Sequence, residues 1–422
     1  MGGLIAKIRS GDWLTRERMR LWALCVLAIS VIAVLYLLAT ANGLSDYQGR
    51  PLGSDFSNVY AAGSFVIEGH PARPYDWAWQ GAREQEIFGT GTQFYGWHYP
   101  PFFLFIAGTL ATMPYLLALA LWQGVTLVLY LVSIGAIVLA QNPALAAPMI
   151  PVRGGVKIDS WLLLALAYPA VLVNIGHGHN GFLTAALLGG ALAFLNRWSV
   201  FAGILFGLLS YKPQFGLLIP LALIAGGYWR AVIAAGATVV ALIGFTTLAF
   251  GMEVWSAFFD STYLTRVEVL EAGATGWQKI QSVFSWVRMW GGSVPLAYAV
   301  QGAVTLVAAG AIVWLWRSDA PYGLKAALLA IGAILATPYS LDYDMMVLAP
   351  AMAFLAADGM ARGFLPWEKS ALALLWFAPL FARAVAEQTL MPIGVWAMLL
   401  VFALVLRRAR GVGAVTPQQA TA

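Results

Sequence analysis

Polar and ionisable residues interrupt the long apolar runs of this sequence at a few turns, and their types suit proton transfer and anion binding. Asp55 stands in the segment Gly53-Ser54-Asp55-Phe56-Ser57. A carboxylate beside a buried acceptor hydroxyl can act as a general base, accepting its proton as a new bond forms. The alternative is a helix cap, because Asp55 precedes a helix expected from Phe56 to Glu68 and an acidic residue stabilises a helix N-terminus. Both interpretations stay open at the level of sequence.

A second polar turn contains two histidines, in Asn174-Ile175-Gly176-His177-Gly178-His179-Asn180. Its glycines permit a tight backbone turn. A His-x-His pair is compatible with a metal site, but zinc needs three or four ligands and no carboxylate stands nearby in the sequence. We therefore favour hydrogen bonds from His177, His179 and Asn180 to a sugar or phosphate. We predict neither a cofactor nor a metal, although a dependence on a divalent cation stays open.

Three basic residues are candidates for binding a phosphate. Lys212, in Tyr211-Lys212-Pro213-Gln214, lies between two apolar segments and would either extend to lipid headgroups or pair with an anion such as a lipid phosphate. Arg266 and Arg288 belong to a tryptophan-containing stretch, residues 252–293. Such a segment either rests on headgroups or offers an arginine that clamps a phosphate with two hydrogen bonds.

The remaining candidates are assigned to the sugar or the acceptor. Asp342 and Asp344 stand two residues apart in the turn 337–344, where Asp342 is alternatively a helix cap. His98 belongs to Trp97-His98-Tyr99-Pro100-Pro101, a position that is also typical of the aromatic belt at a membrane interface. Gln214 completes this set.

The composition places these turns in a polytopic membrane protein. Of the 422 residues, 61% are hydrophobic and only 10% are charged, which excludes an ordinary water-soluble domain. Runs of about 20 apolar residues indicate helices and not a barrel. Cys25 is the only cysteine, so no disulfide can form within the chain. The net charge of +5 comes from residues at the ends of apolar runs, which set orientation and do not indicate nucleic-acid binding.

The hydrophobic pattern predicts an all-α fold with twelve membrane spans. A run of about 12 residues, 102–113, is bounded by prolines and too short to cross the bilayer, so we predict a half-helix there. The expected spans are 21–41, 116–140, 160–176, 180–196, 199–211, 213–228, 231–251, 294–316, 324–338, 344–358, 370–386 and 391–407. Several are only 13–17 residues long, which predicts that the turns 176–180, 210–214 and 337–344 lie below the membrane surface.

Charge counts give these spans an orientation. Sixteen of the 24 basic residues, among them Arg153 and Lys157, lie in one set of loops, and thirteen of the 19 acidic residues lie in the alternate set. The positive-inside rule makes the first set cytoplasmic. We expect a cytoplasmic segment 1–20, a transmembrane domain 21–408 with two outer loops, 42–99 and 252–293, and a cytoplasmic, disordered tail 409–422. The polar turns then face the opposite side.

Taken together, these segments resemble the C-type membrane glycosyltransferases, and among them glycosyltransferase family 87, whose members use polyprenyl-phosphate-mannose. The similarity runs over residues 20–360, through Gly53-Ser54-Asp55-Phe56, Tyr60-Ala61-Ala62-Gly63, Glu68-Gly69, Pro74-Tyr75-Asp76, Tyr99-Pro100-Pro101, the turn near Gly178, Lys212-Pro213-Gln214, Tyr228-Trp229-Arg230 and the turn 338–344. One departure is Gly178-His179, where the family often has Gly-Gln. An imidazole can donate the hydrogen bond that the amide would supply.

The resemblance implies the C-type glycosyltransferase fold and an inverting transfer of a hexose, with mannose preferred, from a polyprenyl-phosphate donor to a lipid or glycan acceptor. Asp55 would be the base, at the periplasmic face of a bacterial inner membrane. A lipid phosphate leaving group needs cationic stabilisation more than a proton, which Lys212 would supply. A transporter or lipid flippase is the alternative, although such proteins usually place polar groups near the midplane between two related halves. A purely structural assembly partner is a third hypothesis.

Overall fold

The computed structural model describes residues 2–141 and 159–412, and helices make up its regular structure. The expected loop with Arg153 and Lys157 lies outside the described residues, as does the expected tail 409–422 from residue 413 on, whereas residues 409–412 of that tail are helical and continue the last helix. The helices are α1 Gly2–Ser10, α2 Arg16–Ala39, α3 Ser54–Ile67, α4 Trp77–Phe88, α5 Leu104–Ala111, α6 Tyr115–Gln141, α7 Ser160–Leu166, α8 Pro169–His177, α9 Gly181–Phe194, α10 Ser199–Leu208, α11 Ile219–Ala225, α12 Trp229–Phe250, α13 Glu253–Leu264, α14 Val283–Met289, α15 Val294–Arg317, α16 Tyr322–Leu335, α17 Leu348–Arg362, α18 Glu368–Thr389 and α19 Ile393–Val412.

Short helical turns join several of these helices. They are η1 Arg73–Tyr75, η2 Pro101–Phe103, η4 Leu209–Tyr211, η5 Pro213–Gly216, η6 Thr265–Glu271, η7 Trp277–Lys279 and η8 Asp342–Val347. Three of them, η4, η5 and η8, occupy the expected sunken turns, where proline or paired aspartates interrupt the apolar sequence.

Each apolar segment that was expected to span the membrane is helical, but the count of twelve crossings is not confirmed. Among the described residues, six helices are long and apolar enough to cross a membrane, and the bent pair α7–α8 would make seven. The shorter apolar helices include α9, α10 and α16. A helix of 14 residues, such as α9, is only about 21 Å long and falls short of a ~30 Å hydrocarbon core. The expected half-helix is present as η2 and α5, Pro101–Ala111.

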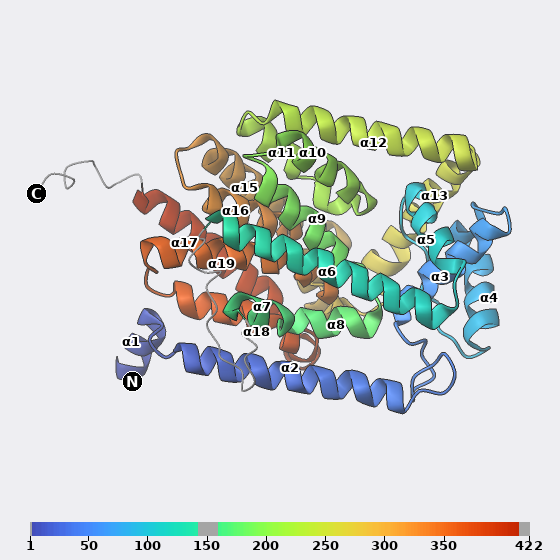
Figure 1. Cartoon of the computed structure of the whole chain (residues 1–422), viewed down its shortest axis with the longest axis horizontal. Coiled ribbons are helices and arrows are strands. Elements are labelled where there is room, and N and C mark those ends of the chain that lie inside the picture. Colours follow the sequence, from blue (N-terminus) through green and yellow to red (C-terminus); the bar gives the residue numbers. More distant parts are fainter. Residues whose placement is uncertain (1, 142–158, 413–422) are drawn as a thin grey trace, which may run out of the picture.

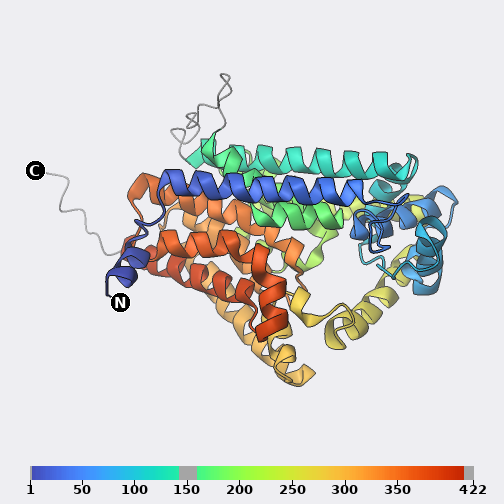
Figure 2. The ribbon, with the colours of Figure 1, turned by 90° about the horizontal axis from the view of Figure 1, so that it is seen from below.

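The long helices run along the long axis of the molecule, and the polar segments gather at one end. In Figure 1, α2, α6 and α12 run in nearly the same direction, and α3, α4, α5 and α13 lie together at the right. Figure 2 gives the same arrangement after a quarter turn. We call the end of the molecule that holds α3, α4, α5 and α13 the Asp55 end. The parts of the chain predicted as two outer loops, 42–99 and 252–293, therefore meet at the same end of the bundle.

The opposite end carries the N-terminal helix and the end of α19, and a buried ionic cluster joins its helices. Arg408 of α19 donates to Asp358 of α17 at 2.7 Å and to Glu368 of α18 at 2.8 Å. The backbone N–H of Trp367 donates to the carbonyl of Arg9, which attaches α1 to the start of α18. Each of these buried charges has a partner, and removing one partner would leave another charge buried without compensation.

Candidate active site

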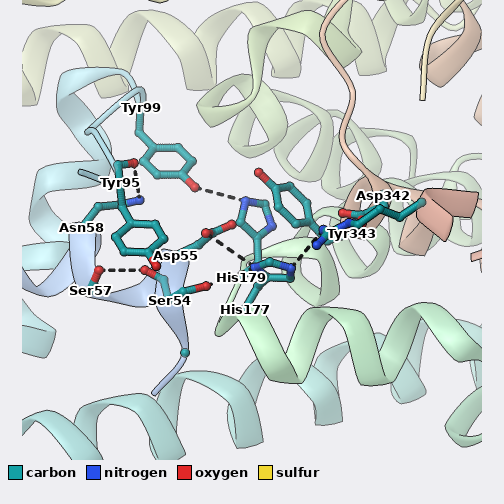
Figure 3. Close-up of polar contacts among 12 residues, drawn as sticks. Ser54, Asp55, Ser57, Asn58, Tyr95, Tyr99, His177, His179, Asp342 and Tyr343 are labelled. Carbon is teal, nitrogen blue, oxygen red and sulfur yellow. Dashed lines mark hydrogen bonds and ion pairs between the residues drawn. The ribbon is translucent and has the colours of Figure 1, made fainter. Parts of the chain in front are cut away.

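The Asp55 carboxylate meets the histidine-rich turn at the Asp55 end of the bundle. One oxygen, Oδ1, lies 3.6 Å from Nδ1 of His177, and the same nitrogen is 3.1 Å from the hydroxyl oxygen of Ser54. The side chains of Asp55 and His177 keep 17% and 26% of their surface exposed. Figure 3 shows both side chains pointing toward one another. The carboxylate is therefore held by the protein and still accessible to a substrate.

Two glycines allow this close approach. Gly53, immediately before α3, and Gly178, immediately after α8, have φ angles of +68° and +63°. A Cβ on Gly178 would lie 2.9 Å from the Cα of Gly53 and 2.7 Å from the Cβ of Phe56. Glycine adopts this backbone conformation without strain and leaves room for the second chain. The pair brings the first turn of α3 against the end of α8.

Asp55 is not the N-cap of α3. Gly53 occupies the cap position without a side-chain hydrogen bond, and Asp55 stands in the first turn. A negative charge there still interacts favourably with the helix dipole. The helix begins two residues earlier than the sequence predicts.

Arg383 of α18 determines how His177 presents its ring. An Nη atom of Arg383 lies 3.3 Å from Nε2 of His177, and a guanidinium can only donate, so Nε2 must be the acceptor. An imidazole whose Nε2 accepts carries its proton on Nδ1, and here Nδ1 faces Ser54 and Asp55. Arg383 is itself held by Asp342, whose Oδ2 accepts from Nε at 3.0 Å and from Nη at 2.6 Å.

Asp342 of η8 therefore forms an ion pair with Arg383 of α18 and does not act as the helix cap. Its other oxygen accepts from the backbone N–H of Tyr343 at 3.0 Å, and the N-cap position of η8 belongs to Leu341. Arg383 was not among the site residues expected from the sequence. An arginine inside the apolar run 370–386 is the signal that would have identified it, because ionisable residues in such runs are rare and usually functional.

His179 and Asn180 continue the cluster beneath Asp55. The His179 ring stacks on Tyr343 with centroids 3.5 Å apart, and its Nε2 lies 3.3 Å from the hydroxyl of Tyr99 (Figure 3). Both residues are buried, yet Nδ1 of His179 and both amide atoms of Asn180 lack a hydrogen-bond partner. Buried polar atoms without partners are uncommon and call for an explanation such as a bound ligand.

Lys212 also lies near Tyr343, with Nζ 5.6 Å from the centroid of its ring, and is already paired. Its Nζ is 2.5 Å from Oδ1 of Asp344, and the two side chains are only 4% and 2% exposed. The second carboxylate oxygen of Asp344 accepts from the backbone N–H of Leu341 at 2.9 Å. Lys212 and Asp344 thus belong to the cluster, but the role of Lys212 in phosphate binding stays a prediction.

The structure does not bring Arg266 and Arg288 to the Asp55 cluster. Arg266 is half-exposed, with 55% of its side chain accessible, and faces Glu271 at 3.5 Å. Arg288 donates to the carbonyls of Gly292 and Glu271 and lies over the ring of Trp277. Both arginines therefore make their contacts within the second predicted loop.

His98 joins the two predicted loops to one another. Its Nδ1 lies 2.8 Å from the hydroxyl of Thr265 in η6. Burial lowers the pKa of His98 to about 4, against the opposing influence of the Asp55 charge. Gln214 follows Lys212 in η5 and is half-buried. No observation tests the assignment of His98 and Gln214 to sugar or acceptor binding.

Within residues 2–141 and 159–412, no group of three or more His, Cys, Asp or Glu side chains is arranged to hold a metal ion. The histidines of the turn 174–180 instead contact Asp55, Arg383, Tyr343 and Tyr99.

Comparison with known proteins identifies the family. The family model for glycosyltransferase family 87 matches residues 97–338, which is more than half of the chain. The matched range contains His98, the histidine-rich turn and Lys212, whereas Asp55, Asp342 and Arg383 lie outside it. No curated protein and no solved structure matches the chain. The all-helical fold, the apolar helices and the family match agree, and the protein belongs to glycosyltransferase family 87.

Proposed function

We propose that this glycosyltransferase moves a hexose, with mannose preferred, from a polyprenyl-phosphate donor to a lipid or glycan acceptor, with inversion at the anomeric carbon. The observation that carries this proposal is the accessible Asp55 carboxylate, held beside His177 in an otherwise buried cluster. Family membership favours a transferase over the transporter that the composition alone also allowed.

In the proposed reaction, Asp55 accepts the proton of the acceptor hydroxyl as that oxygen bonds to the anomeric carbon. The bond between the anomeric carbon and the donor phosphate breaks, and polyprenyl phosphate leaves with the electron pair. The Nδ1–H group of His177 orients the carboxylate, and Ser54 limits the movement of the ring. His177 is a positioning residue in this scheme, because its proton stays on Nδ1 throughout.

The unpartnered atoms of His179 and Asn180 support a sugar-binding role for the same turn. An amide and an imidazole nitrogen offer both donors and acceptors, as sugar hydroxyls require. Asp342, Asp344, His98 and Gln214 remain candidates for the sugar or acceptor. We propose that the reaction needs no metal, because phosphate departure can be assisted by basic side chains.

The proposed location is the inner membrane of a bacterium, with both termini in the cytoplasm and the Asp55 end facing the periplasm. The excess of basic residues at the opposite set of loops supports this orientation. The donor and the membrane lipids would then reach the site from the outer leaflet.

A transfer assay with two donor classes tests the proposal. The purified protein in nanodiscs is incubated with radiolabelled polyprenyl-phosphate-mannose or with radiolabelled GDP-mannose, and a lipid extract of source membranes serves as acceptor. We expect labelled product from the lipid-linked donor, unchanged by EDTA, and none from the nucleotide sugar. Transfer from GDP-mannose alone would contradict the proposed donor class, and loss of product in EDTA would contradict metal independence.

A further inference from the structure

Two basic residues, Lys279 and Arg383, lie at the edge of the Asp55 cluster, and an isolated β-bridge holds the segment that carries Lys279 against the turn that carries Asp342. Ile280 pairs with Leu341 in antiparallel fashion, and the N–H of Gln281 donates to the carbonyl of Ser340 at 2.6 Å. This pairing sets Lys279, the last residue of η7, across from Asp342. The turn η7 also packs against α18, the helix that carries Arg383.

The charges at this edge do not cancel. Lys212 and Asp344 form a closed pair, and the carboxylate of Asp342 is engaged by Arg383. Among the described residues, no side chain forms an ion pair or hydrogen bond with Nζ of Lys279, although this lysine is half-buried. Burial lowers the pKa of Lys279, and the neighbouring Arg383 lowers it further, whereas Asp342 and Asp55 act in the opposite direction.

Part of the Arg383 guanidinium also remains available to a ligand. Its side chain is 35% exposed. Nε and one Nη donate to Asp342 and His177, and no hydrogen bond of the second Nη is found in the described part of the chain. A guanidinium edge beside an ammonium group is a favourable receptor for an anion with several oxygens.

We propose that Lys279 and the free Nη of Arg383 bind the phosphate group of the lipid-linked donor. The inference rests on the proposed function and adds to the phosphate-binding set expected from the sequence, whose members Lys212, Arg266 and Arg288 have partners of their own in the structure. Arg383 contacts His177 through Nε2, and Asp55 faces the opposite ring nitrogen. The cations that stabilise the leaving phosphate and the base that deprotonates the acceptor thus contact different nitrogens of one imidazole, which leaves room for the sugar between them.

A direct binding measurement tests this site without relying on turnover. Farnesyl phosphate, a short polyprenyl phosphate, is titrated into the purified full-length protein in phosphatidylcholine nanodiscs, and farnesol serves as the probe without phosphate. Lys279→Gln should weaken binding of farnesyl phosphate about tenfold or more, the equivalent of one lost charge-assisted hydrogen bond. Farnesol should bind both proteins equally, and Lys279→Arg should retain most of the affinity.

Arg73→Gln is the matched control, since Arg73 is a basic residue of the first predicted loop at the same end and lies over the ring of Trp79. It should bind farnesyl phosphate as the wild type does. An equal loss in this variant would overturn the proposal in favour of general surface charge. Loss of the Lys279 effect in nanodiscs that contain phosphatidylglycerol would assign the lysine to lipid headgroups, and full competition by inorganic phosphate would reduce the site to a general anion site.

The outcomes separate this inference from the function on which it rests. If the wild type binds farnesyl phosphate no better than farnesol, the proposed donor class fails. If the wild type prefers farnesyl phosphate and Lys279→Gln binds it equally well, the donor class survives and the assignment to Lys279 is wrong.

Discussion

Replacing Lys212 with methionine separates a structural role from phosphate binding. The lysine and Asp344 are 4% and 2% exposed and lie 2.5 Å apart. Removing the lysine leaves a buried carboxylate whose remaining contact is the backbone N–H of Leu341. We therefore expect Lys212→Met to destabilise the protein far more than a loss of packing would.

The size of the effect follows from that burial. Removing one partner of a buried ion pair costs about 3–5 kcal/mol, because the other charge stays buried without compensation. Changing Asp344 to asparagine in the same protein removes that charge and keeps an oxygen that accepts from Leu341. The double variant Lys212→Met, Asp344→Asn should recover most of the lost stability.

The assay is thermal unfolding in detergent, followed by the transfer assay on the variants that remain folded. We expect a midpoint several degrees below wild type for Lys212→Met, recovery in the double variant, and measurable transfer by the double variant. Coupling between the two sites is the signature of direct contact. If Lys212→Met unfolded at the wild-type temperature but transferred no sugar, the structural role would be refuted and phosphate binding by Lys212 would be supported.

Three further predictions concern the surroundings of Asp55. Arg383→Gln removes a positive charge from beside His177, so the acid limb of the pH–rate profile should move toward neutral pH; an unchanged limb would argue against an electrostatic role for this contact. Glu84 is buried, and burial raises its pKa to about 7. The stability that Glu84 contributes therefore falls as pH rises from about 4.5 to 7. Glu84→Gln should match the wild type near pH 5 and unfold at a higher temperature than the wild type at pH 8, and a pH-independent difference would contradict this. Gly178→Ala should lower the transfer rate at least tenfold by displacing the start of α3. Gly176→Ala is the control and should leave the rate unchanged, because no atom lies within 4 Å of its added Cβ. Equal rates for the two variants would show that the close approach of Gly178 to Gly53 is dispensable.

The positions of the helices could be predicted from the sequence because the hydrophobic runs are bounded by charge, glycine or proline. The expected span 231–251 is the helix Trp229–Phe250, and 294–316 is Val294–Arg317. The number of crossings could not be settled, because hydropathy measures how apolar a segment is and short helices such as α9 need buried turns that hydropathy does not describe.

The candidate site was predictable in its parts but not in its pairings. The sequence pointed to Asp55, to the turn 174–180 and to Lys212 because polar residues are unusual among apolar runs. It could not show that Asp344 would neutralise Lys212, because these residues are separated by 132 positions. The same holds for Arg383 and His177, which are 206 positions apart. Their contacts depend on how the short helices pack, and no local pattern encodes that packing.

The most direct test of the central claim is the transfer rate of Asp55→Asn from radiolabelled polyprenyl-phosphate-mannose, measured beside Glu86→Gln, which removes an exposed carboxylate of α4. Loss of a general base predicts a fall of about 100- to 10,000-fold for Asp55→Asn, with unchanged expression and monodispersity in detergent, and wild-type transfer for Glu86→Gln. Transfer by Asp55→Asn at the wild-type rate would contradict the account, because the carboxylate at the centre of the cluster would then take no part in the chemistry.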